Sequence, residues 1–96
     1  MLDDSSLVTI KKILSKYLPT SEYKAFIFGS RAAGTSRKFS DIDLGISGPT
    51  PIDRDKLTKI NFDLEDSDIP YIVDVVDFSS VSDKFKQTAL QNAIYI

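Results

Sequence analysis

The sequence contains no histidine and no cysteine. Their absence excludes a Ser-His-Asp triad, a thiolate nucleophile and a zinc site of imidazole and thiolate ligands. Catalysis would then need carboxylates or metals, and carboxylate oxygens favour Mg²⁺, Mn²⁺ or Ca²⁺ over softer metals. The lack of cysteine also excludes a disulfide framework, which suits a reducing compartment, so we expect a cytoplasmic protein.

Long apolar runs and a strong charge of one sign are also absent. No apolar segment approaches the roughly 18 residues of a membrane helix, and the first residues lack the basic and apolar parts of a secretory signal. The formal net charge is −2, which disfavours non-specific binding to nucleic acid, because phosphate neutralisation dominates that affinity. We therefore expect no membrane span and no polynucleotide as the main ligand.

The length and composition indicate one small folded domain over residues 1–96. The hydrophobic fraction of 42% and the charged fraction of 27% are those of a soluble globular protein. A domain of this size buries only about 60% of its unfolded surface, so we expect a partner to contribute stability.

Hydrophobic periodicity and turn residues predict alternating helices and strands. We expect helices at 5–18, 30–34, 51–66 and from about 80–83 onward. We expect strands at 25–28, 41–46, 71–76 and 93–96. In the third helix, Thr50 and Asp53 resemble a capping box with Pro51 as the first helical residue. The order predicts a layered α/β (α+β) domain with a small mixed sheet flanked by helices.

Asp41 and Asp43 lie on the same face of one predicted strand, since side chains alternate along a strand. Aspartate is depleted in strands and like charges there repel, so a cation between the two carboxylates would explain them. The alternative is a solvated strand end.

Asp74 stands in an apolar run of β-branched residues, where a carboxylate has a large desolvation cost unless it is paired or metal-bound. An ion pair with a nearby lysine is the alternative. Asp77 falls on the opposite face at the strand end, where water or a turn can satisfy it. If the strands are neighbours, Asp74 faces Asp41 and Asp43, as a site with two metals about 3.5–4 Å apart requires. Such a site suits phosphoryl or nucleotidyl transfer.

Gly29 and Ser30 follow a predicted buried strand and open a predicted helix. Glycine lets the backbone approach a phosphate closely, and helix-start N–H groups with the serine hydroxyl can donate to it. Arg31, Arg37 and Lys38 lie between this turn and the aspartates. They could screen phosphate charge, although a solvated basic loop is the commoner explanation.

Together these residues fit the pattern G-S-x10-D-x-D, with Gly29-Ser30 followed by Asp41-Ile42-Asp43 and a third carboxylate, Asp74, on a later strand. The pattern resembles the polymerase-β-like nucleotidyltransferase superfamily. Residues 29–35, 40–44 and 70–77 are similar to its minimal nucleotidyltransferases, the MNT family. The resemblance implies a mixed-sheet α/β fold, with two Mg²⁺ ions held by Asp41, Asp43 and Asp74. It also implies a triphosphate, usually of ATP, held by Gly29 and Ser30, and we assign Arg31 to the same binding site.

The resemblance also implies a hetero-oligomer with a helical HEPN-type protein, in which the MNT protein is the antitoxin and some members transfer AMP to a tyrosine of the toxin. Ala33 departs from the family, because many relatives have arginine there. This departure keeps a second hypothesis open, a non-catalytic nucleotide-binding module that neutralises its partner by complex formation. Nucleotide addition to RNA ends is a third, and the acidic charge balance counts against it.

Overall fold

The computed structural model describes residues 4–29 and 41–96. Three helices and four strands lie in these ranges, in the order α1 (Asp4–Tyr17), β1 (Lys24–Phe28), β2 (Ile42–Ser47), α3 (Arg54–Asp66), β3 (Val73–Asp77), α4 (Asp83–Leu90) and β4 (Ile94–Tyr95). The alternation of helices and strands predicted from the sequence is confirmed for these elements. The predicted helix at 30–34 lies outside the described residues.

The four strands form one mixed sheet in the order β3-β2-β1-β4. Strand β1 pairs antiparallel with both β2 and β4, whereas β2 and β3 are parallel. Parallel neighbours need a long crossover connection, and α3 provides it. The predicted mixed α/β fold is therefore confirmed. None of the helices within 4–29 and 41–96 is long and apolar enough to cross a membrane.

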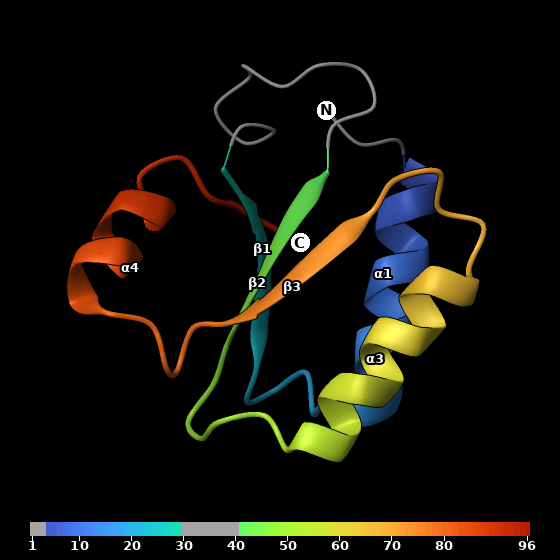
Figure 1. Ribbon diagram of the computed structural model, residues 1–96, viewed down its shortest axis with the longest axis horizontal. Helices are drawn as coiled ribbons and strands as arrows, with labels where there is room; N and C mark the ends of the chain where they lie inside the picture. Colours follow the sequence, from blue (N-terminus) through green and yellow to red (C-terminus); the bar gives the residue numbers. More distant parts are fainter. Residues whose placement is uncertain (1–3, 30–40) are drawn as a thin grey trace.

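Helices α1 and α3 pack together on one face of the sheet (Figure 1). The alternate residues Ile42, Leu44 and Ile46 of β2 point into this layer and are almost fully buried. They meet apolar side chains of both helices, namely Ile10, Ile13, Leu14, Ile60 and Leu64. This layer is the main core, and it fixes which face β2 turns away from the helices.

The opposite face carries an aromatic cluster beneath α4. The Phe26 and Phe78 rings lie 4.8 Å apart and those of Phe28 and Phe78 5.1 Å apart, both edge to face. Gly45 makes room for this cluster, because an added Cβ there would clash with the Phe26 ring. Figure 1 shows α4 on the side of the sheet away from α1 and α3. Phe85 of α4 joins the cluster through ring contacts with Phe28 and Phe78, which hold α4 near β1.

The start of the third helix differs from its prediction. Helix α3 begins at Arg54, and Asp53 makes no side-chain capping bond. Two tertiary hydrogen bonds hold the preceding residues extended: the Tyr23 hydroxyl donates to the Thr50 main-chain oxygen (3.2 Å) and Ile52 N–H donates to Asp77 Oδ2 (2.8 Å). Ile52 is also buried. These contacts override the local signal for a helix starting at Pro51.

Candidate active site

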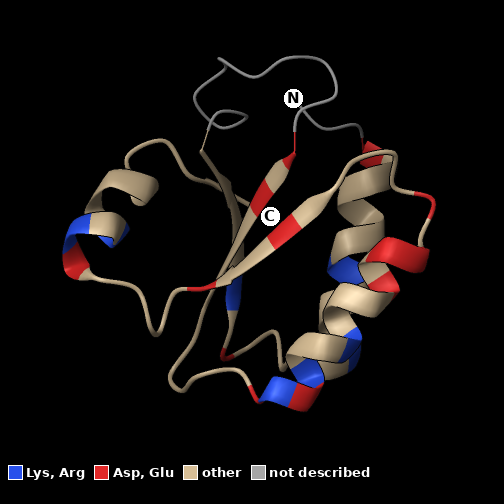
Figure 2. Cartoon of the chain, in the orientation of Figure 1, with Lys and Arg blue, Asp and Glu red and all other residues tan. Residues whose placement is uncertain are grey.

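The sheet register places Phe28, Asp43 and Asp74 in one row across three strands. Phe28 is paired with Asp43 between β1 and β2, and Asp43 is paired with Asp74 between β2 and β3. Directly paired residues of neighbouring strands present their side chains on the same face. The two aspartate-bearing strands are thus neighbours, which is the condition for Asp74 to face Asp43, and Figure 2 shows acidic positions on both.

Asp43 stands at the centre of an acidic group. Burial raises its pKa above the ordinary value of 3.8, and the charges of Asp74 and Asp41 raise it further. Asp41 lies directly before β2 and is exposed. The three carboxylates are therefore near enough for their charges to repel, and a cation bound among them would relieve that repulsion.

Asp74 is exposed, and the prediction that it is desolvated within an apolar strand is wrong. Its strand, β3, lies at the edge of the sheet. The alternative of an ion pair with lysine is not found either, since the salt bridge seen within 4–29 and 41–96 joins Lys16 to Asp63. Asp74 is thus an exposed carboxylate paired with the partly buried Asp43.

Gly29 closes β1 at the end of this row. Its φ of 76° lies in the left-handed region, and an added Cβ would clash with Oδ2 of Asp43. Only glycine both adopts this turn readily and lets the Asp43 carboxylate lie against it. The turn expected to bind phosphate and the central carboxylate are therefore in contact. Ser30 and Arg31, like Ala33, Arg37 and Lys38, lie outside the described residues.

The donor atoms at this site are carboxylate oxygens, which suit a hard divalent cation. Asp43 and Asp74 offer paired carboxylate oxygens, and their repulsion, together with that from Asp41, favours a positive ion. Across 4–29 and 41–96, however, no three acidic, histidine or cysteine side chains are grouped closely enough to hold a metal ion. The predicted closure of Asp41, Asp43 and Asp74 into one three-carboxylate site is not present in this part of the chain.

The Asp77 carboxylate is satisfied by hydrogen bonds within the fold, as its position at the strand end predicted. Its carboxylate accepts hydrogen bonds from Ile52 N–H (2.8 Å) and from Ser79 N–H (2.9 Å) and hydroxyl (2.7 Å). Burial raises the pKa of Asp77, but these hydrogen bonds outweigh burial and bring the pKa below 3.8. The serine two residues later is the sequence signal for such a turn.

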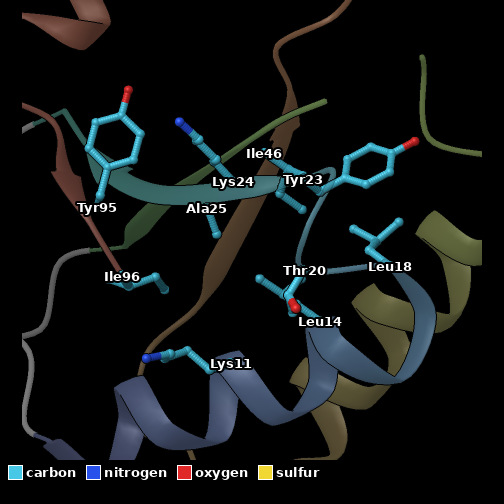
Figure 3. Close-up of a pocket in the computed structure, with 10 residues that line it drawn as sticks. All are labelled: Lys11, Leu14, Leu18, Thr20, Tyr23, Lys24, Ala25, Ile46, Tyr95 and Ile96. Atoms are coloured by element: carbon cyan, nitrogen blue, oxygen red, sulfur yellow. The ribbon is translucent and has the colours of Figure 1, made fainter. Parts of the chain in front are cut away.

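In the part of the chain that the structure describes, pockets lie on both faces of the sheet. One, of about 320 Å³, opens beside Gly29 and is lined by Phe28, Gly29, Phe85, Thr88, Ala89, Gln91 and Asn92. The other, of about 430 Å³, lies among α1, β1 and the Tyr95-Ile96 segment (Figure 3). It contains no carboxylate side chain. Only the first adjoins the row of aspartates, and sequence reasoning missed it because helix α4 meets β1 through tertiary contacts.

The comparisons with known proteins agree with this geometry. The model of the family described as "Polymerase beta, Nucleotidyltransferase" matches residues 8–96. A Haemophilus influenzae protein named "Probable protein adenylyltransferase MntA" is 34% identical over 89 residues, covering 90% of this chain and 74% of that protein.

Solved structures share the fold. A toxin-antitoxin crystal structure with AMP-PNP matches with a TM-score of 0.74 and 23% identity, covering 98% of this chain and 72% of that one. A complex of a tri-AMPylated Shewanella oneidensis HEPN toxin with an MNT antitoxin matches with a TM-score of 0.73 and 20% identity, covering 98% and 71%. With the G-S-x10-D-x-D pattern, the family match and the relative, these findings lead to one conclusion: the chain belongs to the polymerase-β nucleotidyltransferase family of enzymes, within its minimal nucleotidyltransferases.

Proposed function

We propose that residues 1–96 form one Mg²⁺-dependent nucleotidyltransferase domain that transfers AMP from ATP to a hydroxyl group of a partner protein. The observation that carries the proposal is the row of Asp43 and Asp74 on one open face, with the Gly29 turn against Asp43. The name of the Haemophilus relative and the AMP-PNP of the structural neighbour support adenylyl transfer.

The residues of this chain have separate tasks in that reaction. The acceptor hydroxyl oxygen attacks the α-phosphorus of ATP and gives up its proton to water. The bond from that phosphorus to the α,β-bridging oxygen breaks, and pyrophosphate leaves. Asp41, Asp43 and Asp74 would hold the divalent ions, which when bound neutralise phosphate charge and lower the pKa of the attacking hydroxyl. Gly29, with Ser30 and Arg31 after it, would hold the triphosphate. Because Asp43 touches the Gly29 turn, this binding places the reacting phosphate beside the carboxylates.

The acceptor is proposed to be a helical HEPN-type toxin, neutralised by this chain in a cytoplasmic hetero-oligomer. Several structural neighbours are toxin-antitoxin complexes, and in one of them the HEPN toxin carries AMP groups. Ile72, two residues before Asp74, is 70% exposed, which gives a partner an apolar contact near the carboxylates.

The test uses the purified chain, its co-expressed helical partner, Mg²⁺ and α-labelled ATP. Label on the partner that disappears with Asp43→Asn supports transfer. Asp68→Asn is the matched control, since it removes the same charge from an exposed loop position. An unlabelled partner in an intact, neutralised complex would instead support the non-catalytic module, which Ala33 favours. Label on added RNA ends would support the third hypothesis.

A further inference from the structure

We propose that the pocket between the end of β1 and α4 binds the adenine base of the donor nucleotide, with the Phe85 ring as its stacking surface. The inference rests on the proposed function, because it takes the triphosphate to lie at the Gly29 turn. It adds the part of the site that selects which nucleotide is used.

The pocket adjoins the expected phosphate site. Gly29, the expected phosphate turn, is itself part of the pocket wall. Phe28, another wall residue, occupies the same cross-strand row as Asp43 and Asp74. A nucleotide whose phosphates lie over Gly29 and Asp43 can therefore place its base over Phe28 without leaving this face of the sheet.

The apolar wall supplies a ring for stacking. Phe85 is 44% exposed although it belongs to the aromatic cluster. Its ring is held edge to face against Phe28, with centroids 6.1 Å apart at 84°, and 5.7 Å from the Phe78 ring. A ring fixed at its edges and open to solvent is a suitable platform for a base, which stacks on aromatic faces.

The polar wall supplies hydrogen-bonding groups without charge. The Thr88 hydroxyl donates to the Lys84 main-chain oxygen (3.1 Å), so its own oxygen can still accept from an exocyclic amino group. Gln91 and Asn92 are exposed and present carboxamides, which can donate and accept at once. A carboxamide pairs in this way with the N6 and N7 atoms of adenine, whereas guanine lacks the N6 donor. The pocket therefore favours adenine.

An aromatic pocket could also receive a tyrosine ring of the acceptor protein. Adenine is the better occupant because the wall includes the phosphate turn, which the acceptor has no reason to touch, and because several polar groups line it. A tyrosine ring offers a single hydroxyl.

The test measures Mg²⁺-dependent binding of ATP, GTP and inorganic triphosphate by calorimetry. Phe85→Ala is compared with Phe85→Tyr, which keeps the ring, and with Leu90→Ala, which removes an exposed apolar side chain of α4 outside the pocket. We expect Phe85→Ala to weaken ATP binding about tenfold or more, and to leave inorganic triphosphate unchanged. Asn92→Ala, at an exposed position that does not threaten folding, should lower the preference for ATP over GTP.

Four outcomes would overturn the inference. Equal loss of ATP and triphosphate binding in Phe85→Ala, or equal loss of ATP binding in Leu90→Ala, would mean that the change acts through the fold. An unchanged ATP-to-GTP ratio in both Phe85→Ala and Asn92→Ala would exclude a base site. Unchanged ATP affinity with lost transfer to the partner would assign the pocket to the acceptor. If the wild-type chain binds neither ATP nor inorganic triphosphate, the proposed function itself is wrong. That result is distinct from the four above, in which the wild-type chain still binds nucleotide.

Discussion

Asp43 is placed where a carboxylate costs stability unless it has a ligand. Asp74 is directly opposite on the neighbouring strand, and like charges in that position are destabilising. Burial, together with the charges of Asp74 and Asp41, raises the pKa of Asp43. No lysine or arginine pairs with either Asp43 or Asp74 within the described ranges. The paired Asp43 and Asp74 therefore weaken the fold when no ligand is bound. Such a loss of stability is typical of a binding site, here one for a cation and phosphate.

Replacing Asp43 or Asp74 should have opposite effects on activity and on stability. We expect Asp43→Asn and Asp74→Asn to abolish Mg²⁺-dependent AMP transfer, and to stabilise the metal-free protein by up to about 1 kcal/mol because each removes like-charge repulsion. For a domain of this size that is a rise in melting temperature of up to about 4–8 °C. Thermal unfolding in EDTA, with Asp68→Asn as the control, measures it. A fall of several degrees would mean that the carboxylates serve the fold.

Gly29 is predicted to tolerate no side chain. Gly29→Ala should cost about 1–2 kcal/mol for the left-handed backbone, and the added methyl would also displace the Asp43 carboxylate. Triphosphate binding and transfer should both be lost. The double variant Gly29→Ala/Asp43→Ala removes the clash but not the backbone cost, so its destabilisation should be smaller than the sum of the single changes. Strict additivity, measured by urea unfolding, would show that the Gly29–Asp43 contact is unimportant.

At the scale of elements, Asp77 joins β3 to the segment that leads into α3. Asp77→Ala would leave the N–H group of buried Ile52 without its acceptor, which costs about 1–3 kcal/mol. We expect the melting temperature to fall by several degrees while AMP transfer measured well below that temperature persists. The contrast with Asp74→Asn, three residues earlier, is the informative comparison. Loss of activity without loss of stability would place Asp77 in the site instead.

The contact between α1 and α3 depends on pH through Asp63. This carboxylate accepts from Tyr17 Oη (2.6 Å) and forms an ion pair with Lys16 Nζ (2.8 Å). The hydrogen bond from Lys16, followed by that from Tyr17, holds the pKa of Asp63 below 3.8. Since the folded pKa lies below the unfolded one, the stabilisation is present above about pH 4 and is lost as the pH falls through the folded pKa.

Asp63→Asn removes that linkage. The wild-type protein should have the higher urea midpoint at pH 6, and the difference should shrink as the pH is lowered from about 4 towards 2. Both side chains of the ion pair are partly exposed, so the effect should be small and weaken with added salt. A difference that stays constant with pH would contradict a role for the ionised carboxylate.

Local sequence patterns predicted some of these elements correctly and others not. The two-residue alternation in 41–46 correctly predicted the strand that is β2, because alternation is a local signal. The exposure of Asp74 depends on β3 lying at the sheet edge, which no local pattern encodes. The start of α3 was misread because Tyr23 and Asp77, distant in sequence, hold the residues before it. The Phe85 pocket was missed because α4 meets β1 through tertiary contacts.

For the whole molecule, the two sides of the sheet have different tasks. Helices α1 and α3 cover one side with the main core, and α4 covers only part of the other. Among the elements of 4–29 and 41–96, none covers the part over β2 and β3, where Asp43 and Asp74 lie. An open face at one sheet edge allows a partner protein to complete the site without unfolding any element, and a bound partner adds stability by mass action.

A change at Ile72 can test partner binding without disturbing nucleotide binding. Its main-chain oxygen accepts from Ile42 N–H (2.8 Å), which holds Ile72 beside the start of β2, next to Asp41 in the sequence. We expect Ile72→Ser to weaken binding of the helical partner at least about tenfold, as truncation of an apolar hot spot does, with ATP binding unchanged. Phe62→Ser, at an equally exposed apolar residue on α3, is the control. If Phe62→Ser lowers partner affinity and Ile72→Ser does not, the partner docks on the helical side, and the acceptor hydroxyl must reach the carboxylates from beyond that face.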